Sequence, residues 1–88
     1  MDTATAKFAE NLRRHRLRLG LSQERLAEIC ELDRTAISLL ERRKRTPRLD
    51  TIVRLARGLG LSSPCELLEG IRWGDRRPAP TPSRTKSR

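Results

Sequence analysis

The segment 23–42 constrains the fold of this chain more than any other stretch, because its apolar residues recur at the spacing of two short helices joined by a tight turn. Leu32 falls in the turn, and the small side chain of Ala27 lets the second helix cross the first at close range. The residues expected to face the core of this unit are Leu26, Ala27, Cys30, Leu32, Ile37 and Leu40. The opposite face of the second helix is then free to meet a partner.

The chain is strongly basic, with a formal net charge of +9 over 88 residues. Residues 1–73 hold 15 lysines and arginines against 10 acidic residues, and residues 74–88 hold 5 against 1. A body that is basic in its own right favours double-stranded DNA as the partner of a folded surface. The alternative is a solvated, arginine-rich surface without a ligand, which the charge alone leaves open.

The length allows one small domain. Residues 1–73 are expected to form it, whereas residues 74–88 are rich in proline, serine and arginine and are expected to be a disordered tail. A core of that size buries only about 60% of its surface, so a second copy of the chain would add stability. Because the sequence shows neither an apolar run of 18 residues nor a charged-then-apolar leader, we expect a cytoplasmic protein without a membrane span.

The sequence predicts an all-α fold with five helices and no strand. Gly20 is expected to end the first helix, and Ser22 and Asp33 to cap the second and third. The run 63–66 predicts a capping box with proline at the first position of the fifth helix. The predicted helices are Thr5–Leu19, Gln23–Cys30, Arg34–Arg42, Leu49–Leu59 and Pro64–Glu69. The inward positions of the first and fourth helices are Phe8, Leu12, Leu19, Leu49, Ile52, Leu55, Ala56 and Leu59.

Residues that could carry catalysis or bind a metal are sparse. With His15 as the single histidine, no paired nucleophile and no clustered carboxylates, the sequence favours neither an enzyme nor a metal or other cofactor. His15 is instead expected to be a half-buried helix residue. Cys30 and Cys65 fall at core-type positions of the predicted helices, which favours buried free thiols over a disulfide.

A series of anchor residues runs along most of the chain in a fixed order. The anchors are Leu12-Arg13, Arg16, Leu21-Ser22-Gln23, Leu26-Ala27, Ile37-Ser38, Glu41-Arg42, Pro47, Leu55-Ala56, Leu59-Gly60-Leu61 and Leu67-Leu68. In this pattern the chain resembles the lambda-repressor-like helix-turn-helix domains of the Cro and xenobiotic-response-element group. Segment 32–38, with the Glu41-Arg42 pair, most resembles the controller proteins of restriction-modification systems. The resemblance implies a five-helix domain whose third helix enters the major groove of DNA.

The resemblance also implies individual roles in DNA binding. The positions that match base-contacting residues are Arg34, Thr35, Ala36, Ser38, Leu39 and Arg45. The positions that match phosphate-contacting residues are Ser22, Gln23, Arg42, Arg43 and Lys44. An arginine can bind both acceptors of guanine, whereas phosphate contacts set affinity and register. Leu39 has no hydrogen bond to offer, so it either touches a thymine methyl group or sugar, or is an additional core residue.

Other matched positions concern the scaffold. Arg16 and Glu41 match residues that form an ion pair between the first and third helices. Glu31 and Arg43 stand where the family usually has glycine, at positions that favour positive φ and cost another residue about 1 kcal/mol. Relatives pair through the fifth helix and the residues after it, which implies a dimer surface made of Leu67, Leu68, Ile71 and Trp73.

These expectations combine into a homodimeric, sequence-specific transcriptional regulator. Dimerisation would set two recognition helices about 34 Å apart, so the operator would be palindromic with half-sites about 10 base pairs apart. Control through protein concentration and cooperative operator binding would make the regulator autoregulatory. Three alternatives remain at this point: the antitoxin of a toxin–antitoxin pair, a protein-binding adaptor of the transcription machinery such as RNA polymerase, and a nonspecific nucleoid or RNA binder.

Overall fold

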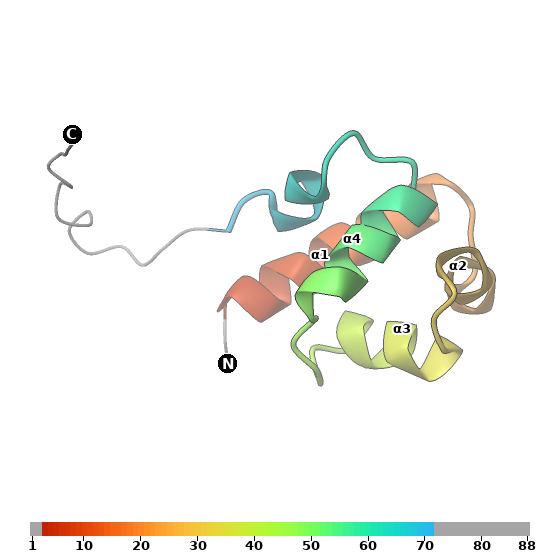
Figure 1. Cartoon of the computed structure of the whole chain (residues 1–88). Helices are drawn as coiled ribbons and strands as arrows, with labels where there is room; N and C mark the ends of the chain where they lie inside the picture. The colour runs from red at the N-terminus through yellow and green to blue at the C-terminus, as the bar shows by residue number, and fades with distance from the viewer. Residues whose placement is uncertain (1–2, 72–88) are drawn as a thin grey trace, which may run out of the picture.

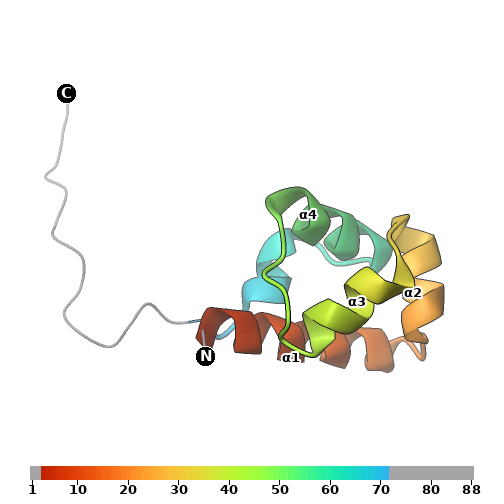
Figure 2. The ribbon, with the colours of Figure 1, turned by 90° about the horizontal axis from the view of Figure 1, so that it is seen from below.

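The arrangement of helices is taken from a computed structural model, which describes residues 3–71. These residues form four α-helices and a terminal 3₁₀-helix, and none of them is in a β-strand (Figure 1). The elements are α1 (Thr3–Arg18), α2 (Gln23–Cys30), α3 (Arg34–Glu41), α4 (Leu49–Gly58) and η1 (Pro64–Leu68). Figure 2 shows α1 along one edge of the fold, with the other elements gathered on one side of it. The predicted all-α class is confirmed.

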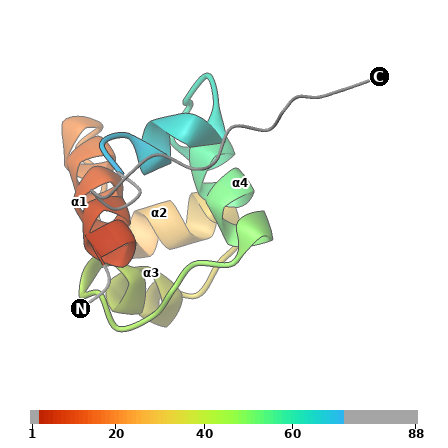
Figure 3. The ribbon, with the colours of Figure 1, turned by 90° about the vertical axis from the view of Figure 1, so that its left-hand side faces the viewer.

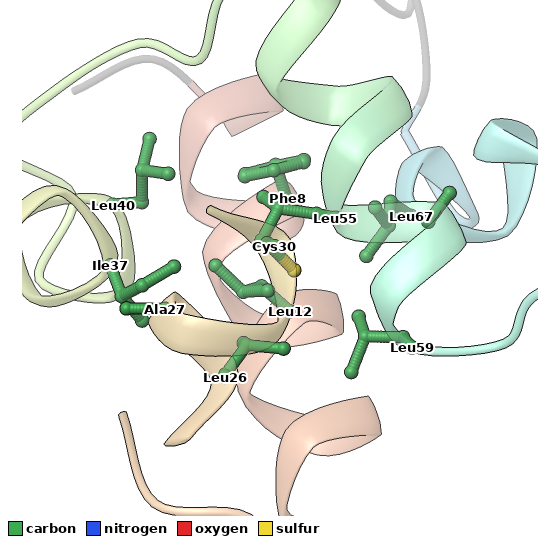
Figure 4. Packing of buried hydrophobic residues seen from close by; sticks show 11 residues of the cluster. Phe8, Leu12, Leu26, Ala27, Cys30, Ile37, Leu40, Leu55, Leu59 and Leu67 are labelled. Atoms are coloured by element: carbon green, nitrogen blue, oxygen red, sulfur yellow. The ribbon is translucent and has the colours of Figure 1, made fainter. Parts of the chain in front are cut away.

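One hydrophobic core joins all five elements. Each element contributes one residue with 0% exposure: Leu12, Leu26, Ile37, Leu55 and Leu67. The whole cluster, of which Figure 4 shows the packing, consists of Phe8, Leu12, Leu26, Ala27, Cys30, Ile37, Leu40, Leu55, Ala56, Leu59 and Leu67. The predicted inner faces of α2 and α3 are therefore confirmed, and the half-buried side chain of Leu32 packs against the core from the turn between them.

The helix ends agree with the predicted signals in all but one case. Gly20 follows α1 with φ +71°, and the Ser22 hydroxyl accepts a hydrogen bond from the Arg25 amide at 2.9 Å. Asp33 has the extended backbone of an N-cap, but its carboxylate makes no capping hydrogen bond. Its carbonyl oxygen accepts hydrogen bonds from the amides of Ala36 and Ile37, at 3.0 and 3.3 Å, as the carbonyl of an N-cap residue does. The predicted side-chain cap at Asp33 was wrong.

The fifth predicted α-helix is a 3₁₀-helix, which corrects the number of α-helices to four within residues 3–71. Ser63 caps it by accepting a hydrogen bond from the Cys65 amide at 3.1 Å, and the Glu66 carboxylate binds the Ser62 amide at 2.9 Å. Gly70 turns the chain away at φ +82°. The helix itself has five residues, too few to propagate hydrogen bonds of the α type, so the segment closes in the tighter 3₁₀ form.

Three apolar residues that were predicted to be buried lie on the surface. Leu19 follows the end of α1 and is 45% exposed, and Leu49 starts α4 beyond the core and is 78% exposed. Cys65 is exposed, and it lies three residues before the exposed Leu68. Residues three apart share one side of a 3₁₀-helix. Cys65 therefore shares the outer side with Leu68, while Leu67 points inward. Both cysteines are free, but only Cys30 is a buried thiol.

Polar side chains of α1 reach the interior. The Asn11 side-chain amide donates to the carbonyl oxygens of Leu67 and Glu69, at 2.9 and 2.8 Å, and so ties η1 to α1. His15 is 8% exposed, which is deeper than the half-buried position predicted for it. Its Nδ1 atom lies 3.2 Å from the Arg18 guanidinium. The sequence carried no signal for the contacts of Asn11, because they depend on where η1 packs.

Candidate nucleic-acid interface

The outer face of α3 offers hydrogen-bonding side chains on an exposed surface. Ile37 and Leu40 are fully buried, so the helix can present only its opposite side to a partner. Arg34 and Thr35, at its N-terminal end, are exposed, and Figure 2 shows α3 crossing the face turned toward the viewer. One shallow hollow on this face is lined by Arg34, Thr35, Ser38, Leu39 and Arg42. Four of the predicted base-contacting residues and one predicted phosphate-contacting residue therefore lie together.

A buried ion pair holds the C-terminal end of α3 against α1. Arg16 donates two hydrogen bonds to the Glu41 carboxylate, at 2.6 Å from Nε to Oε2 and 2.9 Å from Nη2 to Oε1. The side chains are only 8% and 2% exposed. These hydrogen bonds raise the pKa of the Arg16 guanidinium above its ordinary value, although burial opposes the rise, so this guanidinium stays protonated.

Two further contacts extend this ion pair to the start of α2. Arg16 Nη1 donates to the carbonyl oxygen of Leu21 at 2.7 Å, and the Gln23 side-chain amide donates to Glu41 Oε1 at 3.1 Å. One carboxylate thus collects donors from α1 and α2. A buried carboxylate that accepts two hydrogen bonds from one guanidinium has few alternative geometries. The network therefore fixes the orientation of α3 relative to α1.

The two residues in place of glycine do adopt the left-handed conformation. Glu31 has φ +59° after α2, and Arg43 has φ +64° after α3, as the resemblance to the helix-turn-helix family implied. The amides of the following residues, Leu32 and Lys44, donate to carbonyl oxygens five residues back at 2.8 and 2.9 Å. This is the Schellman pattern of helix termination. Each turn is therefore hydrogen-bonded in spite of the strain at its left-handed residue.

The segment after α3 is crowded with cations. Arg42, Arg43, Lys44 and Arg45 follow one another there, and all four are exposed. Arg43 Nη2 lies 3.9 Å from a carboxylate oxygen of Glu10 in α1. The predicted phosphate-contacting residues of this segment therefore lie beside the C-terminal end of α3.

The remaining predicted positions are placed as follows. Ser22 is exposed with its hydroxyl engaged in capping α2, and Gln23 is half-buried against Glu41. Ala36 and Leu39 are half-buried on α3. Leu39 thus lies between the exposed position of a DNA contact and the buried position of a core residue.

The predicted dimer surface needs one correction. Leu67 is completely buried between α1 and α4, so it is a core residue and cannot contact a second chain. Leu68 is 39% exposed and Ile71 is half-buried, which leaves both at the surface. Trp73 lies outside the described residues, as do the tail and the end of the predicted domain.

Neither a metal centre nor a membrane helix occurs among residues 3–71. No group of three or more histidine, cysteine or acidic side chains there is placed to hold a metal ion. No helix in the same range is long and apolar enough to cross a membrane.

Comparisons with known proteins agree with this geometry. The family model described as helix-turn-helix matches residues 12–67. Control protein C.SmaI of Serratia marcescens is 48% identical over 57 residues, which make up 65% of this chain and 68% of that protein. The crystal structure of the restriction-modification controller protein C.AhdI from Aeromonas hydrophila is 39% identical with a TM-score of 0.71, and the match covers 75% of this chain and 98% of that one.

A third relative has been solved together with DNA. The restriction-modification controller protein C.Esp1396I is 30% identical, with a TM-score of 0.71, over 75% of this chain and 87% of that chain. Its structure is a tetramer in complex with its natural 35 base-pair operator. The match to the family model, residues 12–67, includes α2, α3 and α4, and thus the exposed face described above.

Proposed function

The chain belongs to the helix-turn-helix family, and on that premise we propose that it is a sequence-specific DNA-binding transcriptional regulator. In this proposal α3 enters the major groove with Arg34 and Thr35 against base edges. The observation that carries the proposal is the exposed, donor-rich end of α3, held at one angle by the buried pair of Arg16 and Glu41. The similarity to control proteins supports regulation as the purpose of DNA binding.

Base recognition is assigned to the outer face of α3 and to the loop after it. Arg34 is suited to guanine, since a guanidinium can bind both acceptors of that base in the major groove. Leu39 would contribute only apolar contact, for example with a thymine methyl group. The residues proposed to contact bases are Arg34, Thr35, Ala36, Ser38, Leu39 and Arg45.

Phosphate binding is assigned to the residues that flank α3 in space. Ser22 and Gln23 begin α2, where backbone amides and the positive end of the helix favour an anion. Arg42, Arg43 and Lys44 supply cations at the other end of α3. These contacts are proposed to set affinity and position on the duplex and to leave sequence choice to the base-contacting residues.

A homodimer is part of the proposal. Apolar residues remain exposed on two elements that pack against each other: Leu49 and Val53 on α4, and Leu68 on η1, at 78%, 41% and 39%. A second copy covering them together with Ile71 would hold two α3 helices about one helical turn of DNA apart, on a palindromic operator. Regulation of its own gene would then follow from protein concentration, as proposed from the similarity to control proteins.

The test of dimerisation uses two charged substitutions at comparable exposure. Leu68→Lys is expected to shift the sedimentation of the full chain toward the monomer, because a lysine would be desolvated in the interface. Leu17→Lys, at 52% exposure on α1, is the matched control and should leave the distribution unchanged. Equal effects of the two substitutions, or a wild-type chain that is monomeric at all concentrations, would refute this dimer surface.

The test of the function is selection of binding sites from a random-sequence DNA pool, with affinities measured at two salt concentrations. One palindromic consensus should be enriched by the wild-type chain. Arg34→Ala should relax preference at one base pair per half-site and cost about 1 to 3 kcal/mol there. Lys44→Ala should weaken all sequences alike and lower the salt dependence. If no sequence is enriched over competitor DNA, the chain is a nonspecific binder and the proposal fails.

A further inference from the structure

Two side chains of α1 contact the C-terminal end of α3, which Figure 2 shows beside it. The Arg16 guanidinium binds Glu41, the last residue of α3, and a carboxylate oxygen of Glu10 lies 3.9 Å from Nη2 of Arg43. Residues three apart in an α-helix lie on the same side of it. Arg13, midway between Glu10 and Arg16, is therefore on the side of α1 that flanks the end of α3.

Arg13 adds a cation to a surface on which basic side chains already outnumber acidic ones. Arg13, Arg42 and Lys44 are exposed, and none of them forms an ion pair within residues 3–71. Glu10 is the carboxylate that pairs here, and it is shared between Arg43 and Lys7, the latter at 3.4 Å. Clustered cations without counter-charges repel one another and attract a polyanion.

We propose that Arg13 binds a DNA phosphate beside the recognition helix, so that α1 forms part of the DNA interface. The inference rests on the function proposed above, in which α3 occupies the major groove. A helix of eight residues is about 12 Å long, which equals the width of the major groove at about 12 Å. With the N-terminal end of α3 at the base edges, its C-terminal end emerges next to a phosphate strand.

The position of Arg13 on α1 decides which phosphate of the DNA it can reach. Arg16, one turn further on, is locked into the buried pair with Glu41, so α1 cannot rotate away from α3. Figure 3 views α1 from its N-terminal end, with α3 below it. The phosphate that meets the end of α3 is then also the phosphate that lies in front of Arg13.

The neighbouring residue provides a matched control. Arg14 is exposed on the same helix turn, but it points toward η1: it lies 3.4 Å from Glu69, which follows η1, and it donates to Asn11 Oδ1 of α1 at 3.1 Å. Replacement of either arginine by glutamine removes one charge from an exposed site of α1. Only the replacement of Arg13 removes it from the side of α3.

The experiment compares Arg13→Gln, Arg14→Gln and the wild-type full chain by fluorescence anisotropy on a labelled duplex over a range of salt concentrations. Each phosphate contact contributes about 0.9 to the slope of log K against log salt, so its loss weakens binding about eightfold at roughly 0.1 M salt relative to 1 M. Arg13→Gln is expected to show this lower slope and Arg14→Gln the wild-type slope. Circular dichroism melting of both variants checks that the fold is retained.

The possible results distinguish failure of the Arg13 contact from failure of the proposed function. Equal loss in the two variants would mean that only net charge matters, and an unchanged slope in Arg13→Gln would mean that α1 makes no DNA contact; either overturns the inference. Both results leave the proposed function intact if the selected consensus is still preferred. Conversely, absence of any preferred sequence with a reduced slope in Arg13→Gln alone would refute sequence-specific regulation and retain the α1 contact.

Discussion

Removal of Arg16 tests whether the buried ion pair holds the fold together. Arg16→Met takes away both charge-assisted hydrogen bonds and leaves the Glu41 carboxylate, 2% exposed, with the side-chain amide of Gln23 as its remaining partner within residues 3–71. Breaking a buried pair in this way costs about 3 to 5 kcal/mol. The stability of a domain of this length is roughly 3 to 10 kcal/mol in total. The substitution is therefore expected to remove a third of the stability or more.

A double variant separates the free-energy cost of leaving the Glu41 carboxylate without Arg16 from the net contribution of the ion pair to stability. With Arg16→Met and Glu41→Leu together, no buried charge remains, so the loss should be smaller than in Arg16→Met alone. The assay is urea and thermal unfolding followed by circular dichroism, in which each kcal/mol shifts Tm by about 4 to 8 °C. Lys7→Gln is the control, because its pair with Glu10 is exposed and should be worth less than about 1 kcal/mol.

The pH dependence of this contribution has a defined sign. A group whose pKa is raised on folding stabilises the folded state fully below its unfolded pKa, and that contribution is lost as the pH rises through the folded pKa. Since the pKa of Arg16 is raised, the pair should contribute equally to stability from neutral to mildly alkaline pH.

Two results would refute the reasoning on the ion pair. Arg16→Met could lower the free energy of unfolding by no more than Lys7→Gln, or the double variant could lose as much stability as the two single variants added together.

Three further substitutions or measurements test individual features of the fold. Glu31→Gly should raise the free energy of unfolding by about 1 kcal/mol, because φ is +59° there; a lower Tm would contradict this. Gly58→Ala should cost about 1 to 3 kcal/mol, since its Cβ would lie 2.3 Å from the Cys30 sulfur, and Cys30→Ala should relieve the loss. Burial raises the pKa of the Cys30 thiol, so a thiol reagent should modify Cys65 in the folded chain and Cys30 only after unfolding; rapid reaction of both would contradict the burial.

The segment 23–42 could be predicted almost residue by residue because its signals are local. Apolar spacing defined the inner faces of α2 and α3, and the hydroxyl of Ser22 caps α2 within three residues of itself. The left-handed conformation of Glu31 was implied by the family resemblance and stands where α2 has to end for the chain to turn. Local patterns of this kind need no knowledge of the rest of the fold.

The errors arose where burial depends on elements that are distant in sequence. Leu49 has the correct helical spacing for the core, but the first turn of α4 extends past the elements that would cover it. Leu67 was assigned to a dimer surface, although α1 and α4 enclose it. Asn11 had no sequence signal, because its acceptors are backbone carbonyl groups 56 and 58 residues away. Side-chain periodicity gives the face of a helix and not what packs against that face.

Several unfavourable features of the fold lie together at the C-terminal end of α3. Glu41 is a buried carboxylate and Arg43 is strained in the left-handed region. Around them lie Arg42, Lys44 and Arg13, three cations that form no ion pair within residues 3–71. Each feature costs free energy in the isolated chain, and natural proteins tolerate such local costs mainly at functional sites. A merely solvated basic surface would have no reason to gather them at one helix end. A surface that binds a polyanion has such a reason, because phosphate charges offset the repulsion between the cations. The buried pair of Arg16 and Glu41 keeps these cations in place to bind the phosphates.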